Sequence, residues 1–136
     1  MNERQMKAHM RVAAEYASLS YANRRKVGCV IVLDGVVFPG YNGTPSGWDN
    51  ACEVPDGSAT LPHVIHAEQN ALDKVTRSTF SSVGASVFVT TAPCIECAKR
   101  LHGARVSAVY YQDVYHNEDG LNFLRDAGIP VYQIKE

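Results

Sequence analysis

Two short segments of this 136-residue chain carry residue types that together can bind a metal ion. One is His66-Ala67-Glu68, and the other is Pro93-Cys94-Ile95-Glu96-Cys97. Cys94 and Cys97 are three residues apart, so in the first turn of a helix both sulfurs point the same way. The positive end of that helix favours the thiolate form that binds metal. With a nitrogen of His66 the chain offers three ligands, and three protein ligands with an open fourth position are typical of a catalytic zinc.

Glu68 is expected to act beside the metal and not to bind it. Its proposed role is to take a proton from metal-bound water, whose pKa zinc brings near neutrality, and to deliver it elsewhere. Each segment alone is a weak signal, because a Cys-x-x-Cys pair can be half of a structural zinc site or a redox pair. The two segments together indicate a catalytic zinc site far more specifically than either segment alone.

Hydrophobic periodicity and turn residues predict the elements that must position these side chains. Asp34-Gly35 lies between two apolar runs, which indicates a hairpin. Gly103 and Gly128 are expected to end helices, and the loop 42–62 holds three of the six prolines. The predicted helices are 2–19, 64–77, 93–102 and 118–127, and the predicted strands are 27–33, 36–41, 86–91, 106–111 and 130–134.

This order of elements predicts an α/β fold in three layers. After the hairpin the chain holds two β-α-β crossovers, which place parallel strands in a mixed five-stranded sheet with helices on both faces. The length suits one domain over residues 1–136.

The composition excludes several functional classes. Lys and Arg number 13 against 14 Asp and Glu, a balance that argues against a nucleic-acid polymer as partner. No apolar run approaches the ~20 residues of a membrane span, so no membrane partner is expected. The first residues, MNERQMKAHMRV, lack an apolar core, so we expect no secretory signal, a cytoplasmic location and four reduced cysteines.

The two metal-binding segments resemble the zinc signature of the cytidine/deoxycytidylate deaminase superfamily. HAEQNAL (66–72) is followed after 20 residues by PCIECAKRL (93–101). The resemblance implies a cytidine-deaminase-like α/β/α fold and one catalytic Zn²⁺ held by His66, Cys94 and Cys97. It also implies hydrolytic deamination of a nucleobase, with Glu68 as the proton shuttle.

Four further segments resemble the deoxycytidylate (dCMP) deaminase branch, including its compact phage members. They are SYANRRKVGCVIV (20–32), GYNGTPSG (40–47), Asn70-Ala71 and DVYH (113–116). This likeness implies conversion of dCMP to dUMP and ammonia, which feeds dTMP synthesis. It further implies a homohexamer that dCTP activates and dTTP inhibits, and Mg²⁺ is compatible with such triphosphate effectors.

The same likeness suggests substrate and effector residues. Arg24 matches the expected phosphate contact, with Arg25 and Lys26 as alternatives, because a guanidinium fork suits a phosphate. Asn42 suits the sugar 3′-hydroxyl, or is only a turn residue before Gly43.

Tyr115 is expected to contact the nucleotide, or to be an ordinary core tyrosine. Ala67 completes the predicted substrate set, and Gly43 and Thr44 are the predicted effector residues.

The chain departs from the family pattern where some phage relatives hold a second, structural zinc. Ala22 stands at one ligand position, which leaves Cys52 with His63 as a companion, so we expect no second zinc. Two rival functions stay open. A tRNA adenosine deaminase would share the metal ligands but should carry surplus positive charge. A zinc-stabilised binding module would give Glu68 no purpose.

Overall fold

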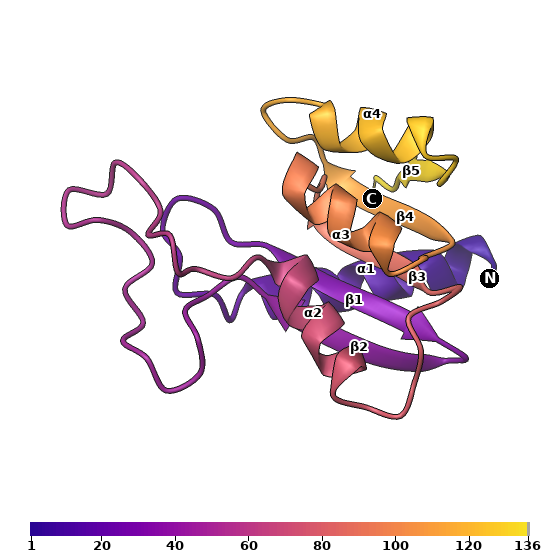
Figure 1. Cartoon of the computed structure of the whole chain (residues 1–136), viewed down its shortest axis with the longest axis horizontal. Helices are drawn as coiled ribbons and strands as arrows, with labels where there is room; N and C mark the ends of the chain where they lie inside the picture. Colours follow the sequence, from indigo (N-terminus) through magenta and orange to yellow (C-terminus); the bar gives the residue numbers. More distant parts are fainter. Residues whose placement is uncertain (136) are drawn as a thin grey trace.

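The structure is a computed structural model that describes residues 1–135, and it contains the predicted elements in the predicted order (Figure 1). The helices are α1 (Glu3–Ala17), α2 (Ala67–Thr76), α3 (Ile95–Gly103) and α4 (Asp119–Asp126). The strands are β1 (Gly28–Leu33), β2 (Val36–Tyr41), β3 (Ser86–Thr91), β4 (Ala108–Asp113) and β5 (Val131–Gln133). Among these helices none is long and apolar enough to cross a membrane.

The five strands form one mixed sheet in the order β2-β1-β3-β4-β5. β1 pairs antiparallel with β2 and β3, whereas β3, β4 and β5 run parallel. Asp34 and Gly35 form the tight hairpin turn between β1 and β2, and both have positive φ, 49° and 78°. This is the conformation that an Asp-Gly hairpin link adopts, so the predicted hairpin is confirmed.

Helices cover both faces of the sheet, which confirms the predicted three-layer α/β/α fold. On one face Met10 and Ala13 of α1 pack against Val30, Val32 and Phe88. On the other face α2, α3 and α4 lie together over the sheet, with α1 behind it (Figure 1). The larger of the two cores lies there and includes Ile31, Val89 and Val109 from strands and Ala71, Leu101 and Leu124 from helices.

Several predicted boundaries were wrong by one to three residues, and those near the metal-binding segments matter for function. α2 begins at Ala67 and not at residue 64, because His66 is its extended N-cap and Ile65 pairs with Gly43. α3 begins at Ile95 and not at Pro93, because Cys94 is the N-cap.

Glycines at two positions, Gly103 and Gly128, were predicted to end helices. The first, at Gly103, is confirmed in place, since Gly103 is the last residue of α3. Ala104 is the C-cap, and the left-handed conformation is taken by Arg105, with φ 60°, and not by the glycine. The second, at Gly128, is confirmed, since Gly128 follows the C-cap of α4 with φ 82°. Strand β4 is shifted to Ala108–Asp113, because this turn at Arg105 precedes it.

Candidate metal centre and active site

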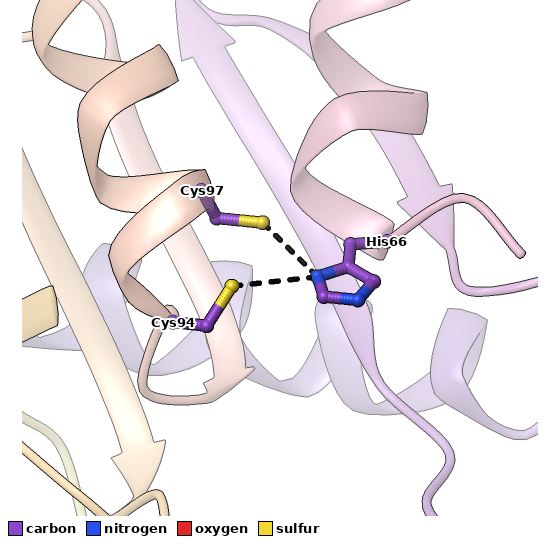
Figure 2. Close-up of side chains that lie close together, drawn as sticks. All are labelled: His66, Cys94 and Cys97. Atoms are coloured by element: carbon purple, nitrogen blue, oxygen red, sulfur yellow. Dashed lines mark hydrogen bonds between the residues drawn. The ribbon is translucent and has the colours of Figure 1, made fainter. Parts of the chain in front are cut away.

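His66, Cys94 and Cys97 converge where α2 and α3 begin side by side on the sheet (Figure 2). Their candidate ligand atoms all lie within 4.8 Å of one another. His66 Nδ1 is 3.2 Å from Cys97 Sγ and 3.6 Å from Cys94 Sγ. In residues 1–135 this is the one group of three or more His, Cys, Asp or Glu with such a spacing.

These distances fit a single zinc ion. Zn–S bonds of about 2.3 Å and Zn–N bonds of about 2.0–2.1 Å at tetrahedral angles separate nitrogen from sulfur by about 3.5 Å. The two N···S distances of 3.2 and 3.6 Å bracket that value. The donor set of two sulfurs and one imidazole is also one that zinc prefers. The predicted ligand set is therefore brought together, with Nδ1 as the nitrogen that faces the sulfurs.

The backbone just before each helix explains why the ligands meet. Gly43 and Ile65 exchange two backbone hydrogen bonds, of 3.1 and 2.8 Å, which fix the segment that leads into His66. Cys94 is extended as N-cap, and its carbonyl accepts a hydrogen bond from the Ala98 amide at 2.8 Å. Cys97 lies in the first turn that follows. The first turn of α3 thus presents both sulfurs to His66, as Figure 2 shows.

Gly120, in α4, packs against the backbone that carries Cys94. A Cβ atom at this position would overlap the carbonyl oxygen of Pro93 and would lie 2.9 Å from the carbonyl carbon and oxygen of Cys94. Distances below 3.0 Å are essentially never seen for a real Cβ. The absence of a side chain therefore lets α4 support the Pro93-Cys94 segment directly, a contact that the sequence pattern did not reveal.

Glu68 lies beside this cluster and is 4% exposed. Burial raises the pKa of its carboxyl group to about 7, against the smaller opposing influence of backbone hydrogen bonding and of His66. Its oxygens do not join the group of ligand atoms within 4.8 Å of one another. A buried carboxyl group that can hold or release a proton near neutral pH has the property that the proposed proton shuttle requires.

The two thiols of the cluster have pKa values shifted in opposite directions. A hydrogen bond from the Cys97 thiol, opposed by burial and assisted by His66, lowers the pKa of Cys94 to about 3. The pKa of Cys97 is raised, because it donates that hydrogen bond and is buried. The lowered pKa of Cys94 favours the thiolate form that binds a divalent ion.

A cavity of about 370 Å³ opens against the metal-binding residues. Its lining contains His66, Cys94 and Glu68 together with all four predicted substrate residues, Arg24, Asn42, Ala67 and Tyr115. This volume is in the range of small-molecule sites. Because His66 and Cys94 are part of this lining, a metal ion held by the three candidate ligands would border the cavity.

The cavity is also lined by residues that the sequence analysis did not select as its lining. His116 adjoins the predicted Tyr115, so proximity could have found it, whereas Arg25, which also lines the cavity, was already named as an alternative to Arg24. Thr60 and Val64 come from the long loop and its end, where no pattern pointed to them. The remaining lining residues are Ala22, Val27, Thr91 and Ala92.

Two predicted substrate residues also make structural contacts. The Asn42 side chain donates to the Arg25 carbonyl and accepts from the Val27 amide, each at 2.8 Å, so it fixes the cationic segment as well as lining the cavity. The Arg24 guanidinium donates to the carbonyl oxygens of Gly57 and Ser58 at 3.3 and 2.6 Å.

The predicted effector residues, Gly43 and Thr44, do not line this cavity, although Asn42 beside them does. They line another hollow of about 550 Å³, together with Tyr41, Lys74 and Arg77. Elsewhere, the Cys52 thiol donates to the Asn50 carbonyl, and the His63 ring lies 5.1 Å from the Trp48 ring, centroid to centroid.

Comparison with known proteins agrees with this geometry. Residues 3–113 match the family model described as "Cytidine and deoxycytidylate deaminase zinc-binding region". This chain belongs to that family. A crystal structure of dCMP deaminase from the cyanophage S-TIM5, in complex with dCMP and dUMP, superimposes with a TM-score of 0.94. The two sequences are 40% identical, and the superposition covers 98% of this chain and 99% of the phage chain.

Curated relatives include longer proteins. Yeast deoxycytidylate deaminase is 34% identical over 91% of this chain, and ComE operon protein 2 of Bacillus subtilis is 32% identical over 82%. The chain spans only 43% and 61% of the lengths of these two relatives.

Proposed function

We propose that this chain is a zinc-dependent dCMP deaminase, which converts dCMP and water to dUMP and ammonia. The observation that carries the proposal is one cavity whose lining joins two of the three candidate ligands, His66 and Cys94, with the buried Glu68 and a cationic segment at Arg24 and Arg25. Similarity to the S-TIM5 structure, which holds dCMP and dUMP, supports this choice of substrate.

Each group in the cavity has a role in this proposal. Zinc, when bound to His66, Cys94 and Cys97, acidifies the water that adds to the ring carbon bearing the amine. Glu68 accepts the two protons of that water one after the other. It passes the first to the ring nitrogen, which keeps it, and the second to the departing amine, so ammonia leaves and the carboxyl group returns to its starting charge. The position of Glu68 beside the candidate ligands, with its side chain buried, supports this shuttle.

The phosphate of the nucleotide is proposed to lie at the cationic segment, with Arg24 as a contact. A nucleoside monophosphate carries about two negative charges, which a guanidinium binds through paired hydrogen bonds. Asn42 is proposed to reach the sugar hydroxyl, since its amide oxygen has a second lone pair and its nitrogen a second hydrogen. Tyr115 and Ala67 are proposed to line the nucleotide. Burial raises the pKa of Tyr115, so its hydroxyl stays a neutral hydrogen-bond donor.

Further parts of the proposal concern the whole protein. We propose that residues 1–136 act as one deaminase domain in the cytoplasm. The family resemblance supports a homohexamer regulated by dCTP and dTTP, with Gly43 and Thr44 at the effector site and Mg²⁺ bound to the triphosphates. The second hollow, which these two residues line, offers a place for such a ligand.

Ammonia release tests the proposal against its rivals. The zinc-loaded protein is incubated in parallel with dCMP, deoxycytidine, CMP and a tRNA hairpin that contains adenosine. The proposal expects fastest release from dCMP. Release from the RNA alone would favour a tRNA adenosine deaminase, and release from none would favour a zinc-stabilised binding module.

A further inference from the structure

Arg25 differs from its two cationic neighbours in what its side chain contacts. Arg24 Nη1 donates to the carbonyl oxygens of Gly57 and Ser58, and Lys26 Nζ donates to the Ser20 carbonyl at 2.6 Å. Within residues 1–135 the Arg25 guanidinium makes no hydrogen bond and no ion pair. Of these three cations, Arg25 is therefore the one whose donors are all available to a ligand.

The main chain of Arg25 is fixed although its side chain is free. Its carbonyl accepts a hydrogen bond from the Asn42 side chain at 2.8 Å, and the same side chain accepts from the Val27 amide at 2.8 Å. Asn42 thus anchors the backbone on both sides of Lys26. A fixed backbone with free guanidinium donors lowers the entropy cost of capturing an anion, since only the side chain must be ordered.

The surroundings of Arg25 favour an anionic ligand. Arg25 lines the cavity that also contains His66 and Glu68, and its charge is felt at the Tyr115 hydroxyl, whose pKa it lowers against the larger effect of burial. Glu68 is the one carboxylate among the residues that line this cavity, and it is buried beside the metal ligands and makes no ion pair with Arg25. Nothing acidic in the lining therefore neutralises Arg25 before a ligand arrives.

The contacts of Arg24 point to a second task for that residue. Glu53 Oε2 accepts hydrogen bonds from the backbone amides of Asn23 and Arg24 at 2.9 and 3.2 Å. With the bonds from the Arg24 guanidinium to residues 57 and 58, this ties the cationic segment to the loop that brings Thr60 into the cavity lining. A phosphate that engages Arg24 must compete with these carbonyl oxygens, whereas one that engages Arg25 displaces only water.

We infer that Arg25 is a specificity-determining residue whose free guanidinium binds the 5′-phosphate of the nucleotide, while Arg24 also fastens the 53–60 loop. This inference rests on the proposed dCMP deamination. It concerns only which side chain distinguishes a nucleotide from its nucleoside, so the two can fail separately.

The test compares dCMP with deoxycytidine in Arg25→Ala, Arg25→Lys and wild-type protein. Arg4→Ala is the matched control, because it removes an arginine that does not line the cavity. Loss of a charge-assisted pair is worth about 10- to 100-fold. We expect Arg25→Ala to lower kcat/KM for dCMP by that factor and to leave deoxycytidine unchanged, with Arg25→Lys intermediate because it keeps the charge and loses the fork. Arg4→Ala should match wild type on both substrates.

The affinity of the protein for the product, dUMP, provides a readout that does not depend on turnover. Calorimetry on the zinc-loaded proteins should show a loss of about 10- to 100-fold in affinity for dUMP in Arg25→Ala, with no change for deoxyuridine. An unchanged preference for dCMP and for dUMP in Arg25→Ala would overturn the inference while the proposed function stands. Wild-type protein that deaminates neither dCMP nor deoxycytidine would overturn both.

Discussion

Gly120→Ala should weaken zinc binding although residue 120 is not a ligand. The new Cβ would overlap the Pro93 carbonyl oxygen and lie 2.9 Å from the Cys94 carbonyl group, where contacts below 3.0 Å are essentially never seen. Both neighbours are backbone atoms, so no flexible side chain can move aside. Either α4 or the segment that carries Cys94 must shift.

The magnitude follows from two opposing contributions to stability. Inserting a methyl group into a packed contact costs about 1–3 kcal/mol. Replacing glycine with alanine inside a helix returns up to about 1 kcal/mol. The net loss in the free energy of unfolding should therefore be about 0–2 kcal/mol, and the variant should fold. Disturbing a residue that supports a ligand typically costs about 10- to 100-fold in metal affinity, which is the expected effect.

Gly103→Ala is the matched control, because Gly103 also lies in a helix but its Cβ would meet no atom within 4 Å. Zinc affinity is measured by competition with a chromophoric chelator, and folding by circular dichroism. Gly103→Ala should keep wild-type zinc affinity. A folded Gly120→Ala protein with wild-type zinc affinity would refute the argument that α4 positions Cys94.

The remaining predictions address the ligands, the shuttle and the core. Glu68→Gln should keep one zinc per chain while kcat falls about 10²- to 10⁴-fold, measured by metal analysis and ammonia release; retained turnover would exclude the shuttle role. Cys97→Ser should lose most bound zinc, measured by metal analysis after dialysis, because it removes a thiolate ligand; full zinc occupancy would mean that Cys97 is not a ligand. Met10→Ala removes a fully buried side chain from the opposite face of the sheet and should destabilise the protein by about 2–5 kcal/mol in urea unfolding without changing metal stoichiometry. Loss of zinc from folded Met10→Ala would show that the two faces are not independent.

The order of the elements was predictable because it depends on local signals. Asp34-Gly35 between two apolar runs can form little other than a tight hairpin, and Gly128 provides the positive φ that ends α4. The exact first residues of α2 and α3 were not predictable, because they depend on contacts between distant residues. His66 is extended because Ile65 pairs with Gly43, which lies 22 residues earlier in the chain.

In the candidate site, too, some features could be predicted from local sequence patterns and others depend on contacts between distant residues. The candidate ligands and Glu68 could be selected from the sequence because their spacing reflects the chemistry of one ion, and the structure brings the three candidate ligands together. The proposed substrate residues Arg24, Asn42, Ala67 and Tyr115 were selected by family resemblance, and all four line the cavity. The supporting contacts escaped prediction: Glu53 accepts hydrogen bonds from amides about 30 residues away, and Gly120 packs on Pro93. Such contacts exist only once the chain has folded and leave no periodic trace in the sequence.

The central claim is that one zinc ion is held by one imidazole and two sulfurs with its fourth position open. X-ray absorption at the zinc edge of the purified protein tests this most directly. We predict two sulfurs at about 2.3 Å and one or two lighter atoms at about 2.0–2.1 Å, with one of the latter replaced or shifted when a nucleotide analogue is added. A shell of four protein ligands that no nucleotide alters, or a protein that binds no zinc, would contradict the account.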